Sequence, residues 1–169
     1  CTTYDGDGST TYGINNVTFT NSGYTGSYIA FKNGTANGFT AHSGTQFGCC
    51  MAAETPPNND WFIIPPIAIQ NGTTFSFWAR SANDTYGFEQ FQVGISQDDQ
   101  NYSLIGGTTY TPWEAPVEWT HYSFDLSHYA GQTLYIAIIC VSNDAFAFFI
   151  DDISVSNSLS ASEIDRDLV

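Results

Sequence analysis

The sequence predicts an all-β protein, folded as a two-sheet antiparallel jelly-roll sandwich, and three observations favour this fold class. No segment keeps a helical period; short runs of β-branched and aromatic residues are instead separated by Gly, Asn, Asp and Pro. The chain of 169 residues is 42% apolar and 16% aromatic, which is enough to fill a core. Only 12% of its residues are charged, so neutral polar side chains must cover the surface, as is common in secreted β proteins.

The individual strands are predicted from two kinds of pattern. Apolar and polar side chains alternate in Thr74–Arg80 and in Phe91–Ser96, as expected of strands with one buried face. Leu134–Val141 and Phe146–Val155 are apolar on both faces, as expected of central strands covered on two sides. Weaker patterns predict further strands at Asn16–Thr20, Ser27–Phe31, Trp61–Ile64, Tyr102–Ile105 and Trp119–Asp125. So many short strands without helices favour a sandwich.

A single domain is predicted for residues 1–156, since this length suits one core. From Asn157 the sequence loses its aromatic residues and gains charged ones, so we interpret residues 157–169 as a linker or tail. No stretch approaches the roughly 18–20 apolar residues of a membrane span, and we expect no membrane insertion.

The charge balance excludes one class of partner. Three cations, Lys32, Arg80 and Arg166, face 17 carboxylates, for a formal charge of −14. Nucleic-acid binding needs clustered Lys or Arg against phosphates, and the sequence has no such cluster. The acidic excess fits solubility, and it also fits a site for a hard cation such as calcium.

Two acidic segments are candidates for that cation site. Asp5-Gly-Asp-Gly8 places two carboxylates, Asp5 and Asp7, two residues apart on a backbone that glycines let curl, although the same pattern also forms ordinary turns. Asp151 and Asp152 interrupt an apolar strand, where adjacent side chains point to opposite faces. A buried carboxylate needs a partner, and cations are scarce, so a metal ion or backbone N–H groups remain as partners.

An exposed aromatic loop is the candidate contact surface. Tyr110 and Trp113 lie in a segment whose two prolines, Pro112 and Pro116, exclude a central strand. Aromatic rings on a loop can stack on the apolar faces of sugars, so we predict that Tyr110 and Trp113 contact a ligand.

Catalysis has weaker support. The chain contains no GxSxG motif of a serine hydrolase. A glycosidase would need two facing carboxylates, and nothing in the sequence selects a pair from Glu54, Glu89, Glu114 and Glu118. We therefore expect no enzyme activity.

The cysteines leave two interpretations open. Cys49 or Cys50 could form a disulfide with Cys140, which would suit an exported protein, or all three could be small buried hydrophobic side chains. Their spacing, with two adjacent cysteines, matches no zinc motif.

Several segments together resemble the cleaved-adhesin, or choice-of-anchor J, family, which includes the adhesin domains of gingipains. Asn59–Ile67 (NDWFIIPPI) is similar to the family signature "DxWLITPxI", and Thr74–Ser81 (TFSFWARS) to its "LSFWARS" strand. Further similar segments follow in the family's order and include Glu89–Ser96, Trp119–Thr120, Asp125–Ser127, Tyr129–Ala137 and the closing Phe149–Val155 (FIDDISV). Near the start, Thr2–Gly8 is similar to its "TxDxDGDG" segment. The resemblance covers residues 2–156.

The resemblance implies a non-catalytic jelly-roll module with structural calcium, which binds an extracellular glycan or protein. It implies a secreted or cell-surface bacterial protein of several domains; an accessory domain of a secreted hydrolase is the alternative function. By analogy, Asp5, Asp7 and Asp151 are candidate calcium ligands. The family's opening strand and its acidic residue, which precede the DGDG segment, do not appear before Cys1. The tail segment Leu159–Ile164 (LSASEI) resembles the linker that precedes a type IX secretion sorting domain.

Overall fold

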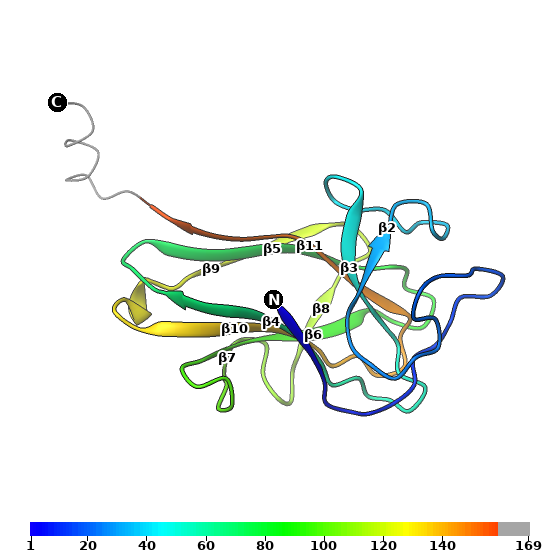
Figure 1. Cartoon of the computed structure of the whole chain (residues 1–169), viewed down its shortest axis with the longest axis horizontal. Helices are drawn as coiled ribbons and strands as arrows, with labels where there is room; N and C mark the ends of the chain where they lie inside the picture. Colours follow the sequence, from blue (N-terminus) through cyan, green and yellow to red (C-terminus); the bar gives the residue numbers. More distant parts are fainter. Residues whose placement is uncertain (159–169) are drawn as a thin grey trace.

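The computed structural model describes residues 1–158, and these form two antiparallel sheets packed face to face (Figure 1). The six-stranded sheet has the order β1–β4–β10–β6–β7, with β8 also paired to β6, and the five-stranded sheet has the order β2–β3–β11–β5–β9. The strands are β1 (Thr2–Asp5), β2 (Ile29–Lys32), β3 (Gln46–Met51), β4 (Asp60–Ala68), β5 (Thr73–Ser81), β6 (Glu89–Ser96), β7 (Ser103–Gly106), β8 (Trp113–Ala115), β9 (Thr120–Asp125), β10 (Thr133–Cys140) and β11 (Ala147–Asn157). A short 3-10 turn, η1, spans Ser127–Tyr129. The predicted all-β sandwich is confirmed.

Most predicted strands are present, with bounds shifted by a few residues. The strand predicted at Asn16–Thr20 is wrong: only an isolated bridge joins Ile14 to Val17 there. Strands β1, β3 and β8 were not predicted. In β3, Gly48 lies where a Cβ atom would come within 2.8 Å of the Ile150 side chain, so close packing selects a residue with little β propensity.

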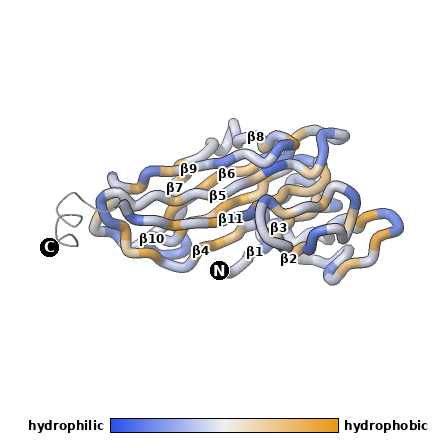
Figure 2. Tube along the Cα trace, turned by 90° about the horizontal axis from the view of Figure 1, so that it is seen from above, coloured by the Kyte–Doolittle hydropathy of each residue, from blue (hydrophilic) through white to orange (hydrophobic). Residues whose placement is uncertain are grey.

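The core lies between the two sheets. Phe75 and Phe77 point into it from β5 and are fully buried, as their alternation predicted. Strand β11 lies between β3 and β5 and is covered on both faces: Phe148 belongs to the core between the sheets, and Phe149 to a second cluster with Phe39 and Phe47. Hydrophobic stretches run along β4, β5 and β6 in Figure 2.

The last strand ends where the tail was predicted to begin. Asn157 pairs with Thr73 at the end of β11, and residues 159–169 of the predicted tail lie outside the described residues. Within residues 1–158, no helix has the length and hydropathy that a membrane span requires.

Strand β4 carries two prolines and still belongs to the sheet. Strand β1 pairs with β4 only up to Ile63, and the pairing of β4 with β10 shifts register opposite Pro65 and Pro66. The missing N–H groups of the prolines therefore interrupt the ladder only at a bulge. The regular pairing of β1 with β4 places Asp5 directly opposite Asp60.

Candidate metal centre

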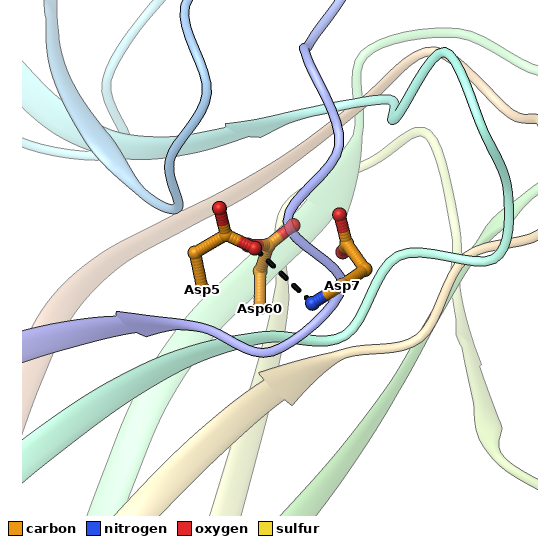
Figure 3. Close-up of side chains that lie close together, drawn as sticks. All are labelled: Asp5, Asp7 and Asp60. Atoms are coloured by element: carbon orange, nitrogen blue, oxygen red, sulfur yellow. Dashed lines mark hydrogen bonds between the residues drawn. The ribbon is translucent and has the colours of Figure 1, made fainter.

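Three aspartates gather where β1 meets β4. Asp5 ends β1, Asp60 begins β4, and Asp7 lies in the turn that leaves β1 (Figure 3). One carboxylate oxygen from each lies within 4.8 Å of the others. We call Asp5, Asp7 and Asp60 the aspartate cluster.

The turn that carries Asp5 and Asp7 depends on its glycines. Oδ1 of Asp5 accepts hydrogen bonds from the backbone N–H groups of Asp7 at 3.1 Å and Gly8 at 2.7 Å. Gly8 has a φ of +69°, which favours glycine. A Cβ atom on Gly6 would come within 2.5 Å of the Asn59 amide nitrogen. The turn therefore needs the two glycines of the DGDG sequence for its backbone geometry, and the two aspartates supply its carboxylates.

Asp7 joins this turn to the start of β4. Its Oδ2 accepts a hydrogen bond from the backbone N–H of Asn59 at 2.6 Å, and its Oδ1 accepts one from Ser9 at 2.8 Å. The backbone N–H of Gly6 donates to the carbonyl oxygen of Asn59 at 2.8 Å. These contacts hold the Asp7 carboxylate beside Asp60.

Asp60 is the buried member, with 1% of its surface exposed. Its Oδ2 accepts hydrogen bonds from the Asn58 amide at 2.8 Å and the Cys50 thiol at 3.4 Å. None of the residues 1–158 donates a hydrogen bond to its buried Oδ1. Burial raises the pKa of Asp60 to about 6; repulsion from Asp7 and Asp5 adds to the rise, and the Asn58 and Cys50 hydrogen bonds oppose it.

The donor set of the cluster fits a hard cation. Three carboxylates so close together repel one another, and a buried oxygen without a donor is costly. Oxygen ligands are those that calcium prefers. Zinc fits less well, because zinc sites in proteins are built mainly from cysteine and histidine, whereas this cluster offers carboxylate oxygens. A calcium ion held by Asp5, Asp7 and Asp60 would supply the positive charge and the missing partner of Oδ1.

The other two predicted metal ligands lie in a β-bulge of β11, where pairing with β5 shifts after Asp151. Oδ2 of Asp151 accepts hydrogen bonds from the backbone N–H groups of His42 at 2.7 Å and Ser43 at 3.2 Å. Asp152, with a φ of +46°, contacts His42 Nδ1 at 2.6 Å and accepts the Ser43 hydroxyl at 2.5 Å. The pair fastens the loop between β2 and β3, and within residues 1–158 it is not part of the aspartate cluster.

The sequence analysis named Asp5, Asp7, Asp151 and Asp152 as metal ligands and did not select Asp60; among the described residues, the structure brings Asp60, and not Asp151 or Asp152, to Asp5 and Asp7. The reasoning applied to Asp151, a lone carboxylate beside an apolar strand in a chain with few cations, holds equally for Asp60, which precedes the apolar run Trp61–Ile64. That signal was present in the sequence. Only the register of β1 on β4 brings Asp60 to Asp5.

The predicted contact residues have different surroundings. Tyr110 lies on the loop between β7 and β8 and is 95% exposed. Trp113 is 39% exposed and begins the edge strand β8 rather than lying in the loop. Its ring stacks on Phe124 at 5.7 Å and on Tyr122 at 5.9 Å between centroids. The Trp113 ring thus packs against two aromatic neighbours, whereas the Tyr110 side chain is almost fully exposed.

The glutamates and cysteines have structural contacts. Oε1 of Glu89, which is 1% exposed, accepts the backbone N–H of Phe146 at 2.6 Å, and Glu54 accepts the hydroxyl of Thr10 at 2.5 Å. Glu114 and Glu118 are exposed.

The cysteines Cys49, Cys50 and Cys140 are buried free thiols. The structure therefore agrees with the interpretation of these cysteines as small buried hydrophobic side chains and not with a disulfide.

Comparison with solved structures identifies the fold. The K1 cleaved adhesin domain of Lys-gingipain from Porphyromonas gingivalis superposes with a TM-score of 0.62 at 15% identity, over 94% of this chain and 90% of that one. The K2 domain of Lys-gingipain gives 0.63 at 19% identity, over 92% and 88%. The chain has the fold of the gingipain cleaved adhesin domains.

The fold of this chain is also similar to that of a carbohydrate-binding module. The module TmCBM61, solved in complex with β-1,4-galactotriose, gives a TM-score of 0.53 at 13% identity, over 78% of this chain and 88% of that one. No protein-family model matches the chain, and no curated protein matches it.

Proposed function

We propose that the chain is a non-catalytic module of a secreted or cell-surface bacterial protein that binds an extracellular glycan or protein and is stabilised by calcium. The observation that carries the proposal is a set of large aromatic side chains exposed outside a filled core: Tyr4, Tyr12, Tyr86, Phe88, Tyr110 and Trp113. Exposed rings offer faces to sugars or to apolar side chains. The cleaved-adhesin fold, shared by adhesin domains and carbohydrate-binding modules, supports the same function.

Calcium has a structural role in this proposal. Asp5, Asp7 and Asp60 would hold the ion and so tie the long loop after β1 to the start of β4. Extracellular modules bind calcium with dissociation constants of roughly 0.1–1 mM, which suits a secreted protein. The ion would supply charge and rigidity, and the ligand would bind elsewhere.

The cations of the chain are few and poorly placed for phosphates. The guanidinium of Arg80 lies 5.8 Å from the Trp119 ring centroid and 5.3 Å from that of Phe149, and it donates to the carbonyl oxygen of Gly38 at 3.1 Å. With a net charge of −14, nucleic acid is disfavoured as a partner, and a neutral glycan or a protein surface is favoured. We propose that any catalysis belongs to other domains of a larger parent protein.

The test is binding of the calcium-loaded chain to arrays of extracellular glycans and proteins, with product formation measured alongside. We expect saturable binding to at least one ligand and no turnover. Binding to none of them, by a protein that melts cooperatively, would support an accessory domain of a secreted hydrolase instead. Turnover that disappears on Glu114→Gln or Glu118→Gln would show an enzyme.

A further inference from the structure

The described residues form a cleft of about 610 Å³ among loops at one end of the sandwich. Tyr12 and Asn15 line it from the loop after β1, Asn83 and Tyr86 from the β5–β6 loop, and Asp144 from the β10–β11 loop. These loops lie together at the right-hand end of Figure 1. The volume falls in the range of small-ligand sites, about 300–1,000 Å³.

The lining of the cleft suits a sugar. Tyr12 is 42% exposed and Tyr86 is 68% exposed, so ring surface is open to stacking on the CH faces of a pyranose. The amides of Asn15 and Asn83 both donate and accept hydrogen bonds, and the carboxylate of Asp144 accepts them, as neighbouring hydroxyl groups require. We propose that this cleft is the ligand site of the proposed binding function and that it takes a neutral glycan.

Charge decides between glycan classes. No Lys or Arg lines the cleft, and Asp144 does. The chain as a whole carries −14. Uronic and sialic acids would therefore meet a negative wall without a counter-charge, whereas uncharged hexoses or pentoses would not.

A peptide fits the cleft less well than a sugar. The lining residues lie in loops outside the named strands, so the cleft has no strand edge to which an extended peptide could add. The cleft also lacks the continuous apolar surface that an amphipathic helix needs, because Asn15, Asn83 and Asp144 interrupt the apolar lining.

Two of the three loops that line the cleft, the loop after β1 and the β10–β11 loop, are fixed to each other through Ala52. The carbonyl oxygen of Ala52 accepts the backbone N–H of Tyr12 at 3.0 Å, and the N–H of Ala52 donates to Phe146 at 2.9 Å. The buried Glu89 carboxylate accepts the N–H of Phe146 at 2.6 Å, which holds the wall that carries Asp144. These two walls therefore lose little conformational entropy when a ligand binds.

The experiment uses the full, calcium-loaded chain and an array of neutral tetra- to hexasaccharides of galactose, glucose, mannose and xylose, followed by calorimetric titration. We expect Tyr86→Ala and Tyr12→Ala each to weaken binding by roughly tenfold. Tyr12→Phe, which keeps the ring, should bind nearly as the wild type does. Asn71→Ala, a change at an exposed side chain in the turn between β4 and β5 and outside the cleft, is the control and should have no effect.

The possible failures separate the cleft from the proposed function. If the chain binds a glycan, but Tyr110→Ala or Trp113→Ala abolishes binding and Tyr86→Ala does not, the cleft is not the site and the binding function stands. If only a protein ligand binds, and Tyr86→Ala abolishes that binding, the glycan class is wrong. Binding of no ligand by the cooperatively melting protein overturns the cleft and the proposed function together.

Discussion

Two groups of aspartates hold loops in this molecule, and they differ in what surrounds their oxygens. In the aspartate cluster, Asp60 is 1% exposed, and its Oδ1 receives no hydrogen bond from the described part of the chain. In the β11 bulge, by contrast, His42 and Ser43 offer backbone and side-chain partners to Asp151 and Asp152. Within the described residues, the aspartate cluster thus has one buried carboxylate oxygen without a donor, whereas both aspartates of the β11 bulge have donors.

The different surroundings of the two groups also shift the pKa values of Asp60 and Asp152 in opposite directions. Burial raises the pKa of Asp60 to about 6. Hydrogen bonds from His42 and Ser43 lower the pKa of Asp152 below its ordinary range. A carboxylate that accepts such hydrogen bonds is stable as an anion without a metal ion, whereas the buried member of a carboxylate trio needs a cation or a proton. We therefore propose the aspartate cluster, and not the β11 bulge, as the place for a cation.

Asp60→Asn should remove most of the stabilisation by calcium. An ion at a hundred times its dissociation constant adds about 2.7 kcal/mol to the free energy of unfolding. For a domain of this size that corresponds to a rise in Tm of roughly 5–10 °C. Thermal melts of the wild type and the variant, each in excess calcium and in excess chelator, measure the difference.

Asp152→Asn is the matched control for that experiment, since it also removes one carboxylate charge. It should keep the calcium shift nearly whole. The reverse result, in which Asp152→Asn abolishes the shift and Asp60→Asn keeps it, would place the ion at the β11 bulge. A wild type without any calcium shift would remove the metal from both places.

In chelator, the calcium-free protein should become more stable as the pH falls. The ordinary pKa of Asp60 is 3.8 and its folded pKa is about 6, so between these values the folded state holds a proton that the unfolded state has lost. This contribution is complete below about pH 4 and is lost as the pH rises through about 6, a change on the order of 2 kcal/mol. Denaturant unfolding from pH 4.5 to 7.5 measures it. Asp60→Asn should remove this contribution and leave that of Glu89, whose pKa burial also raises; identical profiles for both proteins would refute the assignment.

The strands that carry their own alternation were predictable from sequence. β5 and β6 place apolar side chains at every second position, because one face of each meets the core. The segment at Asn16–Thr20 shows a similar composition, yet Asn16 has a φ of +61°, which regular strand pairing does not accommodate outside a bulge. Its Phe19 packs against the second apolar cluster from a loop, so burial there does not need a strand.

The aspartate cluster was predictable only in part. Asp5 and Asp7 are local, since one turn brings their carboxylates together. Asp60 reaches them through strand register, which depends on contacts across the sheet. For Asp151 and Asp152, the sequence could not show the bulge that turns Asp151 toward the backbone of His42 and Ser43 and Asp152 toward their side chains.

The smallest expected effect is the loss of stability caused by Asp152→Asn in the β11 bulge. Asp152 has a φ of +46°, which Asn tolerates, so Asp152→Asn removes charge without backbone strain. Its partly exposed contacts to His42 and Ser43 should cost about 0.5–1 kcal/mol when weakened, equally in calcium and in chelator. Because the folded pKa of Asp152 is lowered, this contribution is present above about pH 4 and is lost as the pH falls further, opposite in sign to that of Asp60. Urea unfolding of Asp152→Asn, His42→Ala and the double variant tests it: additive losses would show that the two side chains act independently, and the contrast between the two groups would then rest on the aspartate cluster alone.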